Sequence, residues 1–271
     1  MSGYKIRFNG LDRLYDAYSW RLTRRAKKAW QTGQVIEGKF LQDFEAKVAD
    51  QSLRKFAVGV GSATDGLYFA MKSLGLTKDS VIACPVLTYI ATGGAIKRLG
   101  ARIEYIDVDQ YGSIGDLKNT PKVDAVVYVN LYGNPADYDR LRKFCDDRRI
   151  PLIEDGAQSQ GAVYKDIPSG KMGDISVLSF APSKNLPCFG TGGLVLTDSV
   201  DVYNKVKALR KHGKGTKEYG YNSFLSDDHA NQLLLLLDKF PKLQKMRQKI
   251  YKRYQKQLDN IQFILKQDKD I

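Results

Sequence analysis

Histidine and cysteine are scarce in this sequence. Its 271 residues include two histidines, His212 and His229, and three cysteines, Cys84, Cys145 and Cys188. The cysteines are odd in number and lack metal-like spacing, and neither histidine has a metal-type partner close to it in the sequence. We therefore expect no metal site and no histidine-based nucleophilic catalysis. The cysteines are predicted to be small buried side chains of a protein in a reducing, cytoplasmic compartment.

Long apolar runs are missing too. No run approaches the roughly 18 residues that a membrane-spanning helix needs, and the start of the chain lacks the apolar core of a secretory signal. Hydrophobic residues nevertheless make up 43% of the chain, which is an ordinary level for a globular protein. We predict a protein with a sizeable buried core and without a membrane anchor.

The charge is strongly one-sided, with a formal net charge of +13. Basic residues cluster at 21–28 and, more loosely, at 239–256. Such clusters suit the phosphates of a nucleic acid, or they form a solvated helix face beside a site for an anionic substrate. The sequence has no zinc-finger spacing, RNA-recognition signature or helix-turn-helix pattern. A basic nucleic-acid-binding module is therefore the weaker alternative.

Between residues 56 and 180, short β-rich runs alternate with helical patterns. Continuous apolar strands interleaved with helices are typical of an α/β fold, with a mostly parallel sheet flanked by helices. Ligands of such sheets bind at the carboxyl ends of the strands. We predict strands at 56–60, 81–84, 101–106, 125–129, 150–155 and 175–180, and helices at 64–74, 89–99 and 138–148.

The two ends of the chain have a different pattern. Residues 1–50 are predicted to form helices and loops on the outside of the protein. From Asp227 onward the pattern indicates two helices, 227–238 and 241–259. We divide the chain into an N-terminal segment with a large α/β domain at 1–225 and a helical segment at 226–271.

A carboxylate and an amine follow two of the predicted strands. Asp155 ends one strand, and Lys184 lies just beyond another. At one edge of a sheet, these two groups suit pyridoxal phosphate (PLP) chemistry. There, a lysine forms a Schiff base and an acid keeps the pyridine nitrogen protonated. In isolation, Asp155 is also compatible with a helix cap or an ion-paired acid, which is the weaker alternative.

The segment Gly59–Gly66 links a predicted strand to a helix. Its small residues let a phosphate approach the backbone at a helix N-terminus, and Thr64 adds a hydroxyl group. A dinucleotide site is disfavoured, because the third glycine is missing and the next strand ends in Cys84-Pro85 rather than an acid. A simple turn capped by Thr64 stays open as an alternative. Further candidates are Ser179 for the phosphate and Gln158 for a ring oxygen of the cofactor.

Several motifs occur together in an order that resembles one family. The chain is similar to the sugar aminotransferases of the DegT/DnrJ/EryC1/StrS family, which are fold type I PLP-dependent enzymes. The resemblance extends from about residue 38 to residue 247. The motifs are Ala-Thr-Asp-Gly-Leu at 63–67, 85–92, 131–137, Glu-Asp-Gly-Ala-Gln at 154–158, Ser-Phe at 179–180 with Lys-Asn-Leu at 184–186, and Gly-Tyr-Asn-Ser at 220–223.

The resemblance implies a role for each candidate residue. Lys184 forms the Schiff base with PLP and then carries protons, while Asp155 pairs with the pyridinium nitrogen. An active homodimer with shared sites is also implied. The other implied cofactor contacts are Gln158 at the phenolic oxygen, Ala63 (through its backbone), Thr64 and Ser179 at the phosphate, Tyr89 stacked on the ring, and Asn222 at the phosphate of the neighbouring subunit.

The resemblance also implies a reaction. An amino group passes from L-glutamate to the keto group of a nucleotide-linked deoxysugar, with a dTDP sugar and its C3 carbon as the finer expectation. The product serves surface-glycan or deoxyamino-sugar biosynthesis. Family dehydratases carry His where this chain has Lys184. Phe224 stands where relatives have Arg, and Gly156 where they have Ala or Cys.

Family members usually continue past the length of this sequence. Their additional residues complete a small C-terminal domain, which we expect to be largely missing here. A non-catalytic relative that binds PLP or a nucleotide sugar is therefore kept as an alternative to the enzyme.

Overall fold

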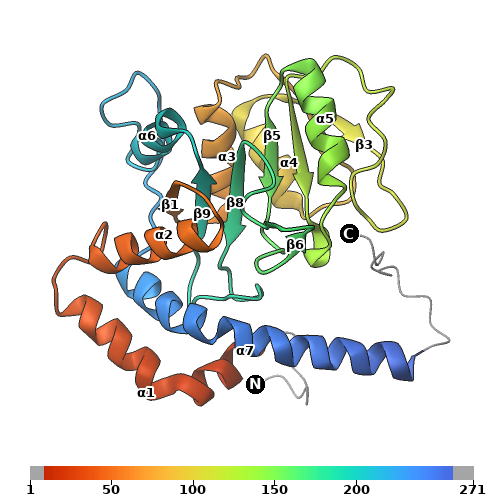
Figure 1. The fold of residues 1–271 in the computed structure, drawn as a ribbon. Coiled ribbons are helices and arrows are strands. Elements are labelled where there is room, and N and C mark those ends of the chain that lie inside the picture. Colours follow the sequence, from red (N-terminus) through yellow and green to blue (C-terminus); the bar gives the residue numbers. More distant parts are fainter. Residues whose placement is uncertain (1–8, 259–271) are drawn as a thin grey trace.

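A seven-stranded sheet forms the centre of the structure, a computed structural model that describes residues 9–258 (Figure 1). Strand β9 pairs antiparallel with both of its neighbours, and all other neighbouring strands in this sheet are parallel. The mostly parallel α/β sheet is thus confirmed, with β9 as an addition to the predicted strands. In spatial order the strands are β1 (Phe56–Val60), β9 (Gly193–Thr197), β8 (Ile175–Ser179), β5 (Leu152–Asp155), β4 (Ala125–Val129), β2 (Val81–Pro85) and β3 (Arg102–Ile106).

Helices cover both faces of this sheet. Successive strand residues point to opposite faces. Ile153 accordingly packs in one apolar cluster and Leu152 in another. The first face carries α3 (Ala63–Ser73), α4 (Ile90–Leu99) and α6 (Val200–Leu209). The second carries α2 (Lys39–Gln51), α5 (Tyr138–Arg148) and the first half of α7 (Asp227–Gln257), against which α1 (Leu11–Trp30) packs.

Short elements complete the chain near the carboxyl ends of the strands. A 3₁₀ turn, η1 (Leu131–Gly133), follows β4. Strands β6 (Val163–Tyr164) and β7 (Ile167–Pro168) form a separate two-stranded hairpin after β5. The predicted outer helices at 1–50 correspond to α1 and α2, and residues 1–8 lie outside the described part.

Helix α7 corrects the prediction of two helices at 227–238 and 241–259. The structure has one helix, Asp227–Gln257, with Pro241 inside it. Proline removes one backbone hydrogen bond from a helix. Tertiary packing compensates, because Leu233, Leu236 and Phe240 are buried in the cluster that α7 shares with α2. Residue 259 lies outside the described residues, and the domain division near residue 225 stays a prediction.

The N-terminus of α7 also caps another helix. Helix α2 begins after Gly38, which has no side chain to cap it. The buried carboxylate of Asp227 accepts a hydrogen bond of 2.8 Å from the backbone N–H of Leu41. A carboxylate beside the N-terminus of a helix stabilises that helix by accepting such a hydrogen bond and by its negative charge. The bond therefore ties α7 to α2.

All three cysteines are buried and free, as the sequence predicts. Within residues 9–258, no helix is both long and apolar enough to cross a membrane.

Candidate active site

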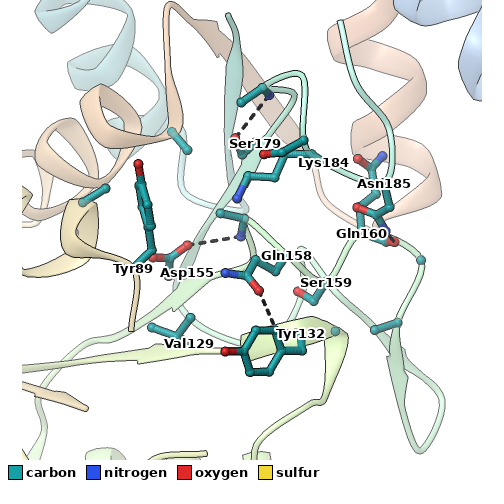
Figure 2. A pocket seen from close by; sticks show the side chains of 18 of the residues that line it. Tyr89, Val129, Tyr132, Asp155, Gln158, Ser159, Gln160, Ser179, Lys184 and Asn185 are labelled. Atoms are coloured by element: carbon teal, nitrogen blue, oxygen red, sulfur yellow. Dashed lines mark hydrogen bonds between the residues drawn. The ribbon is translucent and has the colours of Figure 1, made fainter. Parts of the chain in front are cut away.

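A cavity of about 1200 Å³ lies at the carboxyl ends of β4, β5 and β8. Its wall contains the last residue of each strand, namely Val129, Asp155 and Ser179. Figure 2 shows how side chains from separate segments converge on this space. The predicted site residues in its wall are Ala63, Thr64, Tyr89, Asp155, Gln158, Ser179 and Lys184.

Asp155 is a buried carboxylate at the end of β5. Its Oδ2 accepts a hydrogen bond of 2.8 Å from Thr92 Oγ1, and its Oδ1 accepts one of 3.1 Å from the Ala157 N–H. Burial raises the pKa of Asp155, while these two hydrogen bonds and the charge of Lys184 act in the opposite direction. A cation placed beside this carboxylate would favour its ionised form.

Lys184 lies in the irregular segment between β8 and β9. Its side chain points into the cavity (Figure 2), with Nζ 5.9 Å from the centre of the Tyr89 ring. Burial lowers the pKa of the Lys184 amine, and the nearby charge of Asp155 opposes that change. A lowered pKa increases the fraction of neutral amine, which is the nucleophilic form.

The N-terminus of α3 forms a cradle of backbone N–H groups. Ser62 caps this helix by accepting a hydrogen bond of 3.1 Å from the Asp65 N–H. The first N–H groups of a helix, here those of Ala63 and Thr64, have no acceptor within the helix itself, and they carry partial positive charge. Gly193 permits the close approach of β9, because a Cβ there would lie 2.7 Å from the nitrogen of Ala63.

Ser179 adds a hydroxyl group to the same wall of the cavity. Its Oγ accepts a hydrogen bond of 3.4 Å from the Ala181 N–H. The Ser179 hydroxyl proton is still available for an acceptor in the cavity. The helix N–H groups and this hydroxyl together suit a phosphate group.

Gln158 is held in one orientation by a backbone contact. Its Oε1 accepts a hydrogen bond of 2.9 Å from the N–H of Tyr132 in η1. Because the oxygen is engaged in this way, the amide NH₂ is the group that Gln158 offers to a ligand. Tyr132 has a φ of 58°, in the left-handed region that non-glycine residues seldom adopt.

Asn222 is the one predicted residue that does not line the cavity. It is exposed and forms an isolated β-bridge with Lys211. The neighbouring Ser223 accepts a hydrogen bond of 2.9 Å from the Gly61 N–H and donates one of 2.7 Å to Asp65. Asn222 is therefore attached next to the α3 cradle but outside the cavity of its own chain.

Sequence reasoning missed three contributors to this site. Thr92 lies in the segment quoted as a motif, and the signal that could have shown its hydroxyl pair is Thr88, four residues earlier and just before the N-cap of α4. Asn185 and Arg247 are far apart in the chain, yet both line the cavity. No local pattern predicts the contact between them.

The residues present fit the PLP molecule on three counts. The α3 N-terminus and Ser179 suit its phosphate, the buried Asp155 suits a protonated pyridine nitrogen, and the NH₂ of Gln158 suits a phenolate oxygen. An amine with a lowered pKa, Lys184, lies in the same cavity. The polar groups of the cavity therefore match those of the cofactor.

Comparison with known proteins supports the same assignment. The model of the DegT/DnrJ/EryC1/StrS aminotransferase family matches residues 20–270. The chain belongs to this family. It is 32% identical over 238 residues to UDP-2-acetamido-2-deoxy-3-oxo-D-glucuronate aminotransferase of Pseudomonas aeruginosa, a match that covers 84% of this chain and 66% of that protein. It is 31% identical over 242 residues to dTDP-3-amino-3,4,6-trideoxy-alpha-D-glucose transaminase of Streptomyces venezuelae, with coverage of 86% and 64%.

A solved structure supports both the fold and the cofactor. NtdA from Bacillus subtilis, with bound cofactor PMP, matches with a TM-score of 0.84 and 26% identity over 97% of this chain and 62% of that one. PMP is the aminated form of PLP, so the expected PLP-dependent fold is confirmed together with the family. The present chain spans about two thirds of the length of the two curated relatives named above, at 66% and 64%.

Proposed function

We propose that this protein is a PLP-dependent aminotransferase that acts on a nucleotide-linked keto sugar. The observation that carries the proposal is the shared cavity of Lys184 and Asp155. A nucleophilic amine and a buried acid lie there together with a helix N-terminus suited to a phosphate. When bound, PLP supplies an electron sink that stabilises the carbanion formed during amino transfer.

Lys184, Asp155 and the groups that hold Asp155 each have a separate role in this reaction. Lys184 Nζ would hold the cofactor, and as a free amine in the same cavity it would accept and return the proton of the substrate. Asp155 keeps a proton on the ring nitrogen, because its ionised form attracts that positive charge. Thr92 and the Ala157 N–H hold the Asp155 carboxylate in place.

The finer substrate assignments rest on the relatives. L-glutamate is our proposed amino donor and a dTDP sugar our proposed acceptor, although the relatives include both UDP and dTDP enzymes. The names of these two relatives place a keto group or an amino group at C3, which supports amination at that carbon, whereas other relatives are named for an amino group at C4. We place the reaction in the cytoplasm, in deoxyamino-sugar biosynthesis for glycans.

A homodimer with shared sites is part of the proposal. Support comes from the exposed apolar side chains beside the cavity, among them Tyr89, which is 66% exposed, and Ile90, which is 81% exposed. A second copy that covered these side chains would remove them from water. Asn222, outside the cavity of its own chain, would then be available to the cavity of the partner.

One alternative keeps a specific observation in its favour. A PLP- or nucleotide-sugar-binding protein without turnover is the second candidate, because the cavity lining suits the cofactor whether or not an amino group is then transferred. The basic residues at 21–28 and 239–256 lie on the α1 and α7 helices. Family membership favours the enzyme over a nucleic-acid-binding module.

A visible absorption spectrum tests the proposal. The purified protein is mixed with PLP, and the yellow band of lysine-bound PLP is recorded before and after the addition of L-glutamate. We expect a band that bleaches with glutamate in the wild type and is missing in Lys184→Ala. A stable band that does not change when L-glutamate is added would favour the binding protein without turnover. The absence of a band in the wild type would reject PLP binding by this chain.

A further inference from the structure

Helix α7 contacts the segment that carries Lys184. The helix passes along the edge of the domain where the strands end (Figure 1), and Gln244 and Arg247 from it line the same cavity as Lys184. The guanidinium group of Arg247 donates a hydrogen bond of 2.9 Å to the backbone carbonyl of Asn185, the residue after Lys184. The contact joins residues 62 positions apart in the sequence.

The contacted segment has little regular structure of its own. Residues 180–192, between β8 and β9, contain no helix or strand. Within the segment, the Lys184 N–H donates a hydrogen bond of 2.9 Å to Ala181. Asn185 is held from two sides, because its side chain donates a bond of 2.5 Å to the carbonyl of Gln160 while its own carbonyl accepts from Arg247. Contacts from outside the segment therefore add to its internal hydrogen bonds in fixing the position of Lys184.

Arg247 is itself oriented by a neighbour on α7. Its second terminal nitrogen donates a hydrogen bond of 2.8 Å to Gln244 Oε1, one helical turn earlier. Among residues 9–258, no carboxylate forms an ion pair with this guanidinium group. Burial lowers the pKa of Arg247. Both oxygens that it contacts are neutral, and one of them belongs to the Lys184 segment.

We propose that Arg247 is a positioning residue for Lys184. By holding the carbonyl of Asn185, it keeps the Lys184 segment in the conformation that directs the amine into the cavity. The inference rests on the proposed bond between Lys184 and PLP. In that bond, Nζ replaces the aldehyde oxygen of PLP, which leaves as water.

Two ligands separate this role from a general effect on the site. PLP bonds to Lys184, whereas pyridoxine 5′-phosphate lacks the aldehyde and reports only the non-covalent contacts. The variants are Arg247→Met, which removes the N–H donors, and Arg247→Lys, which keeps the charge and has its N–H donors on a single nitrogen. Arg253→Met is the matched control, because Arg253 contacts Gln257 on the same helix and is not part of the cavity wall.

Equilibrium binding of both ligands gives the decisive comparison. We expect Arg247→Met to weaken PLP binding by about tenfold, the effect of losing one hydrogen bond to a charged group, and to leave pyridoxine 5′-phosphate binding unchanged. Arg247→Lys should recover part of the PLP affinity, and Arg253→Met should match the wild type. The pH midpoint of the yellow band should also shift in Arg247→Met, because the amine is no longer held in one position.

Two results would overturn the proposal. Equal weakening of both ligands would mean that Arg247 binds the phosphate or supports the whole site. Wild-type behaviour of Arg247→Met would mean that the Asn185 contact does not position Lys184. In both cases the wild type still shows its band, which distinguishes these results from failure of the proposed function.

Discussion

The Thr92 hydroxyl donates a hydrogen bond of 2.8 Å to Asp155, and this bond connects the first turn of α4 to the end of β5. Thr92 is also 2.8 Å from the hydroxyl of Thr88. A hydroxyl has a single proton, and that of Thr92 is used by Asp155. Thr88 must therefore be the donor to Thr92. The chain of two hydroxyls ends on the carboxylate and stabilises its ionised form.

Thr92→Val should slow amino transfer and change its pH dependence. The hydroxyl of Thr92 opposes the rise in the pKa of Asp155 that burial causes, so its removal raises that pKa further. The ionised carboxylate is the form that holds the proton on the ring nitrogen. The acidic limb of the pH–rate profile should therefore move to higher pH, with a rate loss of about tenfold near that limb.

The profile is measured by bleaching of the PLP band with L-glutamate across the pH range. Thr88→Val is the control, because it removes the outer hydroxyl of the chain and should shift the profile less. An unchanged acidic limb in Thr92→Val would contradict the role assigned to this hydrogen bond.

Lys184→Met should stabilise the PLP-free protein in a pH-dependent manner. Burial lowers the pKa of Lys184 in the folded protein below the ordinary value of 10.5, so the unfolded chain binds its proton more tightly. The stability of the wild type therefore rises with pH between the lowered value and 10.5. The advantage of Lys184→Met should be largest below this window and should vanish above it.

Urea unfolding at a series of pH values measures this difference. Lys256→Met, near the exposed end of α7, controls for the loss of one positive charge. A constant difference between Lys184→Met and the wild type at every pH would contradict the lowered pKa.

The adjacent Glu154 and Asp155 have different roles. Glu154 is 0% exposed, and its carboxylate accepts hydrogen bonds from a set of neutral donors. These donors anchor the β6–β7 region and β8 to the end of β5, whereas Asp155 faces the cavity. The donors are the side chains of Asn130 (3.0 Å), Ser169 (2.9 Å) and Ser176 (2.7 Å) and the backbone N–H groups of Gly170 (3.0 Å) and Met172 (3.0 Å).

Glu154→Gln should therefore destabilise the fold. The new NH₂ group would face donors instead of acceptors, and leaving buried polar groups unpaired costs about 2 kcal/mol or more in the free energy of unfolding. Chemical denaturation measures the loss, with Glu104→Gln on the edge strand β3 as the control. Equal stability of Glu154→Gln and the wild type would show that the network can rearrange at no cost.

The sequence predicted the parts of this site that depend on local pattern. Asp155 ends one buried strand and Lys184 follows another, and parallel strands end at one edge of a sheet, so their meeting could be anticipated. Strand β9 could not be placed in this way, because its antiparallel insertion between β1 and β8 depends on distant pairing. The contact between Arg247 and Asn185 escaped prediction for the same reason.

Helix α7 shows a second limit of sequence reasoning. Pro241 suggests a break, since proline disfavours a helix interior. The structure keeps the helix intact, because residues such as Leu236 and Phe240 gain more from burial than the lost hydrogen bond costs. Whether burial outweighs a local signal depends on partners that only the folded chain supplies.

The contact between Tyr132 and Gln158 leads to a last prediction, because it comes from the backbone and not from the tyrosine side chain. Tyr132→Gly keeps the N–H and tolerates the observed φ of 58°, and the lost side chain is 65% exposed. PLP affinity should therefore stay close to that of the wild type. Tyr132→Pro removes the N–H and restricts φ to about −65°, so Gln158 loses its orientation.

The affinity for PLP and the pH midpoint of the yellow band distinguish these variants. Tyr132→Pro should resemble Gln158→Leu, with weaker binding and a midpoint at higher pH, because the phenolate oxygen loses its donor in both. Similar damage in Tyr132→Gly and Tyr132→Pro would assign the effect to the tyrosine ring. Wild-type values in Tyr132→Pro would show that Gln158 keeps its orientation without the backbone bond.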